Sequence, residues 1–287
     1  MTHPLPPEVR AWLAHRGYTV ARVQAVAGGD INQAWRVHTA QGVSFFLKTH
    51  ADPPPDMFAR EAEGLQALRV PDGPVVPEPF VWGARFILME DLRPGPRRPE
   101  YWPEFGRRLA ALHHHIGPQF GFAHDNYIGL TPQPNPWTDD GYAFFAQHRL
   151  GYQAARAHRR GLLSAADRAR VERLAERLPE WIPPQPASLL HGDLWSGNAL
   201  TDAAGRPAIV DPAAYYGWAE ADLAMTALFG AFPDAFYRAY EEARPLEPGY
   251  RERFPLYNLY HLLNHLNLFG TAYLGSVQAI LDRFVGP

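Results

Sequence analysis

The chain has 287 residues, of which 46% are hydrophobic and 20% are charged, a balance typical of a globular protein and not of a disordered or membrane-spanning one. Its net charge of −3 provides no broad positive field, so we expect neither nucleic acid nor a membrane surface as a partner. It contains no cysteine, which excludes disulfides, thiolate metal sites and cysteine nucleophiles. Residues 1–7 lack the basic and apolar segments of a signal peptide, and a cytoplasmic location is expected.

The part of the chain up to residue 90 favours a small antiparallel sheet with one inserted helix. Runs rich in β-branched and aromatic residues alternate with turn signals such as Gln41-Gly42, and a proline-rich stretch over 51–56 precedes a segment of helical character. The elements predicted from these patterns are a helix over 4–15, strands over 20–26, 32–39 and 43–49, a helix over 57–68, and strand segments over 75–82 and 85–90.

Beyond Arg93 the pattern changes to helices. Apolar side chains recur three or four residues apart, which is the spacing of one helix face. The predicted helices are those carrying Phe105, Leu109, Leu112 and Ile116, those carrying Val171, Leu174, Leu178 and Trp181, and those over 138–160, 220–229, 234–243 and 251–274. We therefore predict an α+β molecule of two lobes. A small antiparallel β lobe with one inserted helix covers 1–92, a larger and mostly α-helical lobe covers 93–287, and a cleft lies at their junction.

The most informative stretch, residues 191–198, reads His-Gly-Asp-Leu-Trp-Ser-Gly-Asn, and a short apolar strand ending at Asp211 follows it. An Asp followed five residues later by Asn, with a second Asp after a strand, is the spacing of a kinase catalytic loop. A capped turn explains the His-Gly-Asp triplet alone, but not the whole set. In this interpretation Asp193 accepts the proton of a substrate hydroxyl, while Asn198 and Asp211 are hard oxygen ligands for Mg²⁺ bound to ATP. We expect the stretch to be a loop between helices of the second lobe.

Lys48 is the only lysine among 27 basic residues, and it ends a predicted strand. Strand alternation places Phe46 and Lys48 on one face, so the ammonium can reach the α- and β-phosphates of ATP while Phe46 covers the adenine. A compact ammonium suits a crowded phosphate site better than a planar guanidinium does. The following helix offers Glu61 or Glu63 as the ion-pair partner of the lysine, and we favour Glu61.

Two further segments complete the predicted nucleotide site. Gly28 and Gly29 lie between the first two strands, where a loop can cover the phosphates, because glycine allows close backbone approach and positive φ. The same pair also suits an ordinary hairpin turn. The lobe junction presents backbone groups that can meet the adenine edge, and its residues are Met89, Glu90, Asp91 and Leu92. The sequence lacks the G-x-x-x-x-G-K-[ST] signature of a P-loop.

The residues described so far resemble the fructosamine kinases (ketosamine 3-kinases), a family within the protein-kinase-like and aminoglycoside-phosphotransferase-like fold. The resemblance runs from about residue 28 to residue 270, and its most specific parts are residues 191–198 and Thr-Pro-Gln-Pro-Asn at 131–135. It implies ATP with Mg²⁺, and phosphorylation of the sugar 3-hydroxyl of ketoamines such as ribulosamines and fructosamines, which leads to deglycation. It also implies Asp193 as the base, Asn198 and Asp211 as metal ligands, and Asp222 as a buried carboxylate that holds the catalytic loop.

The acceptor side of the site is less clearly marked. Trp195 and Trp218 are candidate walls for the acceptor, although core packing explains an aromatic residue equally well. Asn126 and Asn135 are candidate partners for sugar hydroxyls. Only eight residues separate Asp211 from Glu220, too few for an activation segment that also docks an extended peptide. We therefore expect a small or tethered acceptor and activity without loop phosphorylation.

The histidines are given supporting roles. His191 is expected to brace the catalytic loop and not to transfer protons. His261 and His265 lie four residues apart, but Leu262 stands where the H-E-x-x-H metal motif needs its Glu, so we interpret them as an ordinary helical pair. Two alternative functions stay open: another small-molecule kinase of the same fold, acting on an amino alcohol such as choline or on an aminoglycoside, and a nucleotide-binding module without catalysis. Whether the ketoamine is free or protein-bound, and the oligomeric state, are not indicated.

Overall fold

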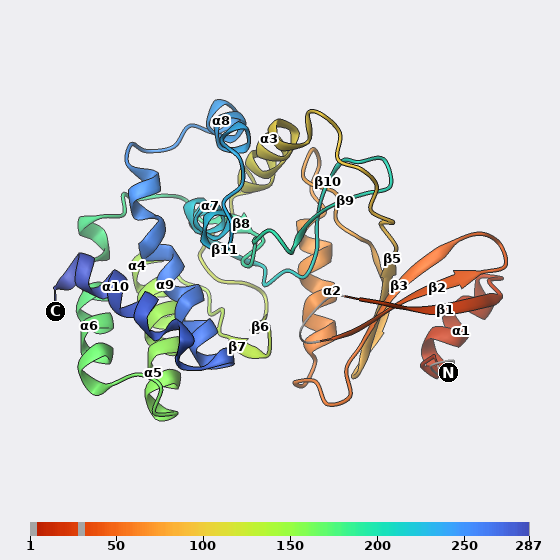
Figure 1. Cartoon of the computed structure of the whole chain (residues 1–287), viewed down its shortest axis with the longest axis horizontal. Helices are drawn as coiled ribbons and strands as arrows, with labels where there is room; N and C mark the ends of the chain where they lie inside the picture. Colours follow the sequence, from red (N-terminus) through yellow and green to blue (C-terminus); the bar gives the residue numbers. More distant parts are fainter. Residues whose placement is uncertain (1–4, 28–31, 287) are drawn as a thin grey trace.

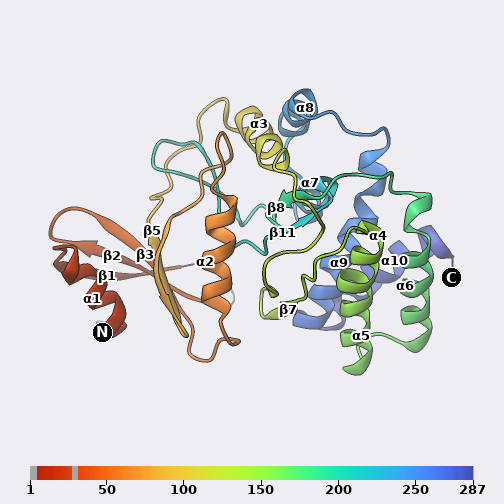
Figure 2. The ribbon, with the colours of Figure 1, turned by 180° about the vertical axis from the view of Figure 1, so that it is seen from behind.

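The computed structural model describes residues 5–27 and 32–286, so the glycines expected to cover the phosphates, Gly28 and Gly29, lie outside the described residues. The sheet of the N-terminal part lies at one end of the molecule, and helices α4, α5, α6, α9 and α10 lie at the other end (Figure 1). Helix α2 lies between them in both views (Figures 1 and 2). The first helix, α1, and the last helix, α10, therefore lie at opposite ends of the molecule (Figure 1).

The N-terminal part is an antiparallel sheet of five strands in the order β1-β2-β3-β5-β4. The central strand β3 carries Lys48, which pairs with Ala34 of β2 and Ile87 of β5. The elements are α1 (Pro7–His15), β1 (Val20–Val26), β2 (Gln33–Thr39), β3 (Ser44–Thr49), α2 (Met57–Leu68), β4 (Pro79–Gly83) and β5 (Phe86–Glu90).

The two faces of this sheet have different neighbours, as the alternation along β3 predicts. Phe45 and Leu47 pack with Val9 and Leu13 of α1 in a small hydrophobic cluster on the outer face. Phe46 and Lys48 face the opposite way and line the cleft toward the C-terminal part. The only lysine of the chain is thus held on a central strand and directed toward the second lobe.

Helix α2 belongs to the larger core and not to the small one. Its apolar side chains Phe58, Ala62 and Leu65 are fully buried in the same cluster as the helices of the C-terminal part. At Gly64 a Cβ atom would lie 3.2 Å from the Pro212 ring, so the helix packs closely against the segment that follows Asp211. The two lobes therefore share one continuous core through α2.

Within the described residues, the C-terminal part is mostly helical, and three two-stranded sheets and three short helical turns lie between its α-helices. Its elements are α3 (Tyr101–His113), β6 (Asn126–Ile128), β7 (Thr131–Gln133), α4 (Gly141–Phe145), a π-helical turn η1 (Ala146–Gly151), α5 (Tyr152–Arg159), α6 (Ala165–Glu176), η2 (Leu178–Glu180), β8 (Ser188–Leu190), β9 (Ala199–Thr201), β10 (Pro207–Ile209), β11 (Tyr215–Gly217), α7 (Ala219–Leu228), α8 (Asp234–Ala243), α9 (Tyr250–Phe269), η3 (Thr271–Tyr273) and α10 (Leu274–Val285).

Several predicted boundaries are wrong for local reasons. The catalytic stretch lies between strands β8 and β9, not between helices, because strands of three residues are too short to show a period. The helix predicted over 251–274 ends at Phe269, where Gly270 takes φ 86°, and α10 follows it. The helix predicted over 138–160 begins at Gly141 and contains a π-helical turn. Ile116 lies beyond the end of α3 and is exposed.

The two-lobed α+β architecture agrees with the prediction, whereas the exact boundary between residues 92 and 93 stays a prediction. No helix within the described residues is both long and apolar enough to cross a bilayer.

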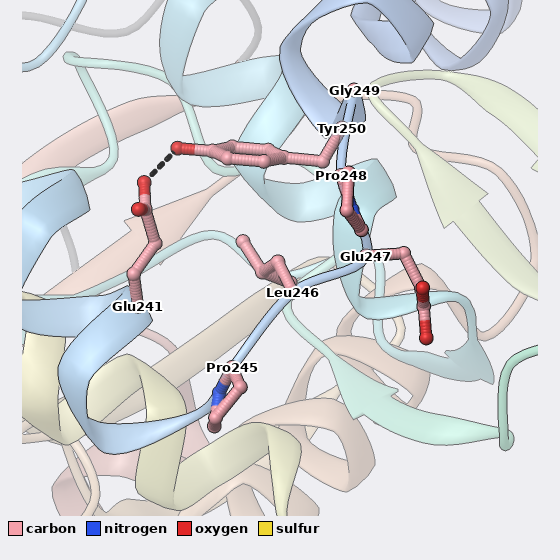
Figure 3. A pocket seen from close by; sticks show the side chains of 7 residues that line it. All are labelled: Glu241, Pro245, Leu246, Glu247, Pro248, Gly249 and Tyr250. Atoms are coloured by element: carbon pink, nitrogen blue, oxygen red, sulfur yellow. Dashed lines mark hydrogen bonds between the residues drawn. The ribbon is translucent and has the colours of Figure 1, made fainter.

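A hollow of about 350 Å³ lies on the surface where the loop after α8 enters α9 (Figure 3). The Tyr250 hydroxyl donates a hydrogen bond to Glu241 at its edge. Behind it, Arg253 donates to Pro248 O at 2.8 Å and pairs with the buried Glu220 at 2.6 Å. The hollow therefore lies on the outer side of a loop that Arg253 holds against the core, and we assign no chemistry to it.

His113 links the fold to pH. It is fully buried at the end of α3, with Nδ1 2.7 Å from the Tyr240 hydroxyl and Nε2 3.2 Å from Asp222 Oδ2. Burial lowers the pKa of His113 below its ordinary value of 6.5, although Asp222 opposes this shift. The unfolded chain therefore binds the proton more readily, so the stability from a neutral His113 is complete above pH 6.5 and is lost as the pH falls.

We expect His113→Gln to reduce the loss of unfolding free energy between pH 6.5 and about pH 5.5 by about 1 kcal/mol, because the variant has no imidazole to protonate on unfolding. Urea titrations of both proteins at the two pH values measure this difference. Equal losses in the two proteins would show that His113 is not a source of the acid sensitivity.

Candidate active site

A cleft of about 1170 Å³ separates the sheet from the helical lobe. Its roof is the inner face of the sheet with α2, and its floor is the catalytic loop with α7 and α9. Most of the predicted catalytic and nucleotide-binding residues that the structure describes line it, namely Lys48, Glu61, Met89, Glu90, Asp91, Leu92, Asp193, Asn198 and Asp211. Residues that are 163 positions apart in the chain, Lys48 and Asp211, are in direct contact here.

Asp193 lies at the floor of the cleft in the loop between β8 and β9. Asn198 Nδ2 donates to Asp193 O at 2.8 Å and to its Oδ2 at 3.3 Å, which fixes the carboxylate within the loop. Burial raises the pKa of Asp193 to about 7, and the carboxylates of Asp211 and Asp222 add to this shift. A carboxylate with a pKa near neutrality is well suited to accept a proton from a hydroxyl group.

Asp222 holds the catalytic loop from below. Its two carboxylate oxygens accept the backbone N–H groups of His191 at 2.7 Å and Gly192 at 2.8 Å. Burial alone would raise the pKa of Asp222, but its hydrogen bonds with His113 and with the Gly192 N–H lower it overall, so the group is ionised. Gly192 is required by the tight turn, because its φ is 81° and a Cβ atom would lie 2.1 Å from Ala213 O.

His191 lies beneath the loop and is fully buried. Its Nε2 lies 2.9 Å from Val210 O, and its Nδ1 accepts the N–H of Asp193 at 3.3 Å. Burial lowers the pKa of His191, so the ring is neutral and ties the Asp193 loop to the strand that precedes Asp211. This geometry fits the bracing role expected from the sequence.

Lys48 joins the two lobes across the cleft. Its Nζ lies 2.5 Å from Glu61 Oε1 and also contacts Asp211 Oδ1. Burial alone would lower the pKa of Lys48, but the two carboxylates more than offset this and raise it. The lysine is therefore charged. Glu63, the other candidate partner, faces elsewhere and pairs with Arg60 at 2.8 Å.

Asp211 and Asn198 offer oxygen atoms suited to a divalent cation. The Asp211 side chain is 48% exposed and faces the cleft. The Asn198 amide nitrogen is used by Asp193, while within the described residues no donor is bonded to its Oδ1. A carboxylate and an amide carbonyl, both hard oxygen donors, are the ligand types that Mg²⁺ prefers. The residues present therefore fit a magnesium ion.

Some of the residues at the lobe junction, 89–92, make structural contacts, and others face the cleft. The Glu90 N–H is already bonded to Glu78 O at 2.8 Å, so it does not serve a ligand. The Asp91 carboxylate accepts Arg36 Nε at 2.7 Å and Ser44 Oγ at 2.6 Å, which fixes the junction against the sheet. Met89 and Leu92 are buried next to the cleft.

The far end of the cleft is lined by an aromatic cluster. Apart from Trp195, its members were not predicted to contact the acceptor. Trp195, the predicted acceptor contact, is 37% exposed and lies 6.5 Å from the Phe229 ring. The His265 ring lies 4.8 Å from the Phe229 ring, and the Phe269 and Tyr273 rings lie 5.4 and 5.1 Å from that of His265. Because these side chains come from the catalytic loop, the end of α7, α9 and η3, no linear motif marks them. The one signal in the sequence was Phe269 immediately before Gly270, since glycine commonly follows the end of a helix.

Three predicted acceptor residues are corrected by the structure. Trp218 is 3% exposed and packs against Phe145 and Tyr257, so it is a core residue and not an acceptor wall. Asn126 and Asn135 are also buried, and their amides bond to the backbone and to each other. Asn126 borders the cleft, but its polar atoms are occupied, so neither asparagine is free to bind a sugar hydroxyl.

Comparison with known proteins agrees with this geometry. A family model described as fructosamine kinase matches residues 9–286. A Synechocystis protein named a probable ketoamine kinase is 45% identical over 271 residues, covering 93% of this chain and 91% of that one. A chloroplastic protein-ribulosamine 3-kinase of Arabidopsis thaliana is 39% identical, with 96% and 87% covered.

Solved structures show the same fold. The crystal structure of a Thermobifida fusca protein that carries the name fructosamine-3-kinase superposes with a TM-score of 0.87 at 36% identity, covering 95% of this chain and 96% of that one. A ternary complex of the aminoglycoside phosphotransferase APH(2")-IIa has a TM-score of 0.65 at 12% identity, with 99% and 100% covered, and supports the fold alone. The resemblance seen in the sequence is confirmed, and the chain belongs to the fructosamine kinase family.

Proposed function

We propose that this protein transfers the γ-phosphoryl group of ATP to the sugar 3-hydroxyl of a ketoamine, such as a ribulosamine or fructosamine adduct, and so starts deglycation. The observation that carries the proposal is the convergence of Lys48, Asp193, Asn198 and Asp211 on one cleft in a member of this family. Relatives at 39–45% identity bear the names ketoamine kinase and protein-ribulosamine 3-kinase.

The nucleotide half of the site is built by the sheet and α2. Phe46 and Met89 line the cleft near the lobe junction and provide apolar surface for the adenine. The ammonium of Lys48, held by Glu61 at 2.5 Å, is directed to the α- and β-phosphates. The ammonium also bonds to Asp211. Phosphate oxygens of ATP would share the ammonium with this carboxylate.

Asn198 and Asp211 would hold Mg²⁺ through their side-chain oxygens. When bound, the ion neutralises charge on the β- and γ-phosphates and orients them for in-line transfer. The buried Asn198 is positioned by its two bonds to Asp193. The same side chain therefore links the metal ligands to the general base.

Asp193 accepts the proton of the attacking hydroxyl as the phosphoryl group moves. Its carboxylate is held by Asn198 below the cleft, and the loop that carries it is fixed by Asp222. Most of the rate enhancement in this class of reaction comes from positioning and charge stabilisation. The rigid hydrogen bonding of the loop supplies that positioning.

The aromatic cluster of Trp195, Phe229, His265, Phe269 and Tyr273 forms the acceptor end. Aromatic faces stack well on the apolar face of a sugar ring and on aliphatic chains. Trp195 is two residues from Asp193, so a sugar ring against it places a hydroxyl within reach of the carboxylate. The remaining rings can contact the amine part of a ketoamine.

The segment 212–219 supports a constitutive enzyme. It contains β11, which pairs with β8 in register Tyr215 with Leu190, so it is part of the fold and not an extended regulatory loop. A cytoplasmic location stays a prediction.

The acceptor class is tested by ADP release with Mg²⁺ and ATP in the presence of four candidate acceptors. We expect turnover with ribulose-lysine and fructose-lysine, and none with choline or kanamycin, because relatives at 39–45% identity bear the names ketoamine kinase and protein-ribulosamine 3-kinase. Phosphorus NMR of the product locates the phosphate on the sugar 3-hydroxyl. Unglycated lysine is the control. Turnover with choline or kanamycin alone would identify a different small-molecule kinase, and no turnover would indicate a binding module.

Asp193→Asn should lower kcat by about 10²–10⁴-fold, because the amide cannot accept the hydroxyl proton. The dissociation constant of ATP, measured by calorimetry, should change by less than about threefold, since the loss concerns the transition state only. Lys48→Met is the matched comparison and should weaken ATP binding. A near-normal kcat in the Asp193 variant would remove this residue from its role.

Trp195→Ala should raise the KM for the ketoamine by about tenfold, which corresponds to about 1.4 kcal/mol of lost contact. The KM for ATP should not change, because Trp195 lies at the acceptor end. Trp137→Ala is the matched control, since Trp137 is 44% exposed and does not line the cleft. A raised KM in both variants would argue for a general effect on the fold.

A further inference from the structure

A buried network of polar side chains lies behind the segment that follows Asp211. None of its members is more than 4% exposed, and they come from β6, β7, the turn after β7, the π-helical turn and α9. They are Asn126, Gln133, Asn135, Arg149 and Tyr260. The network includes part of the Thr-Pro-Gln-Pro-Asn motif, which the proposed function leaves without a role.

The network ends on two backbone carbonyls close to Asp211. Gln133 Nε2 donates to Ala213 O at 3.0 Å, and Asn126 Nδ2 donates to Ala214 O at 2.8 Å. From the other side, Ala213 N–H donates to His191 O at 2.9 Å. The two alanines are therefore fixed between the network and the catalytic loop.

The direction of these hydrogen bonds is set from the far end by Arg149, which can only donate. Its Nη2 donates to Asn135 Oδ1 at 2.7 Å, so Asn135 Nδ2 is free to donate to Asn126 Oδ1 at 3.0 Å. That bond turns the amide nitrogen of Asn126 toward Ala214 O.

Tyr260 sets the direction at Gln133. Its hydroxyl donates to Gln133 Oε1 at 2.6 Å, which turns the amide nitrogen of Gln133 toward Ala213 O. The same nitrogen donates to Asn126 Oδ1 at 2.7 Å. Every amide on the path to Ala213 and Ala214 therefore has one orientation only.

Arg149 is fully buried, and among the described residues no carboxylate is paired with it. Its guanidinium donates to Pro134 O at 2.8 Å and lies 4.0 Å from the Tyr215 ring and 4.5 Å from the Phe144 ring. Burying a guanidinium is costly unless its N–H groups are bonded. The buried guanidinium of Arg149 is thus energetically costly, and it is the group that orients the amides of the network.

Asp211 needs such support because its backbone is strained. Its φ is 58°, in the left-handed region that non-glycine residues adopt only uncommonly. On its N-terminal side, Val210 N–H is bonded to Asn198 O at 3.1 Å. On its C-terminal side, Ala213 and Ala214 are held by Gln133 and Asn126. Asp211 therefore lies between two segments whose backbones are both fixed by hydrogen bonds.

We propose that this network positions Asp211 as a metal ligand, acting through the backbone of Ala213 and Ala214. The inference rests on the proposed function, since it takes Asp211 as a magnesium ligand. Its members are positioning residues, because their polar atoms bond to the backbone and to one another. Groups that orient a ligand from outside are worth about 10–100-fold in metal affinity in other proteins.

The test compares Tyr260→Phe and Gln133→Met with the unmodified protein. Tyr260→Phe removes only the hydroxyl that orients Gln133, and Gln133→Met keeps the length of the side chain without its donor. Mn²⁺ binding is measured by electron paramagnetic resonance in the presence of a non-hydrolysable ATP analogue. We expect the Kd for Mn²⁺ to rise by about tenfold or more in Gln133→Met and to rise by a smaller factor in Tyr260→Phe. The Mg²⁺ concentration for half-maximal rate should rise in parallel, with kcat at saturating Mg²⁺ nearly unchanged.

Tyr257→Phe is the matched control. Tyr257 lies on the same helix, is 1% exposed, and donates its hydroxyl to Glu220 at 2.9 Å, so its loss costs a similar buried hydrogen bond away from Asp211. We expect a lower thermal midpoint in this variant with no change in the Kd for Mn²⁺.

The outcomes separate this inference from the proposed function. An unchanged Kd for Mn²⁺ in Tyr260→Phe and Gln133→Met, or an equal rise in Tyr257→Phe, would overturn the positioning role while leaving the kinase assignment intact. If Gln133→Met fails to fold, the comparison of Tyr260→Phe with Tyr257→Phe decides alone. Failure of the unmodified protein to bind Mn²⁺ with the nucleotide analogue would overturn the proposed function itself, and the inference with it.

Discussion

The ion pairs of Lys48 are the interaction on which the rest of the site depends. One ammonium contacts Glu61 on α2 and Asp211 in the second lobe, so a single charge fixes the sheet, the helix and the segment that carries Asp211 relative to one another. The two carboxylates keep it protonated in spite of burial. Because Lys48 and Glu61 are largely removed from water, removing one partner of that pair leaves an uncompensated buried charge, which is strongly unfavourable.

The catalytic loop adds a second layer of order around this contact. Asp222 takes two backbone N–H groups of the loop, and the neutral His191 connects the loop to the strand before Asp211. Asn198 then links Asp193 to the metal side. The same short stretch of sequence is thus held by carboxylate, imidazole and amide groups at once, which is how a loop acquires the rigidity that phosphoryl transfer requires.

The parts of the site predicted from the sequence are those whose residues are close in the chain or marked by composition. Residues 191–198 form one loop, and Lys48 stands out as the only lysine. The predictions for Trp218, Asn126 and Asn135 were wrong because the residue type alone does not show whether an aromatic or amide side chain faces a ligand or the core. His265 and Phe229 were missed because tertiary packing of α7 against α9, and not spacing, brings them together. The strands β8 to β11 are too short to show a hydrophobic period, so the strands that flank the catalytic loop could not be predicted from the sequence either.

The close approach of α2 to Pro212 at Gly64 has a consequence for control of the enzyme. The helix carrying Glu61 is embedded in the main core and pressed against the segment after Asp211, so swinging it outward would open a cavity in that core. Opening such cavities costs several kcal/mol in proteins. We therefore expect the arrangement in which Glu61 faces Lys48 to be the ground state of the folded chain, so that the proposed reaction needs no separate step that swings the helix into place.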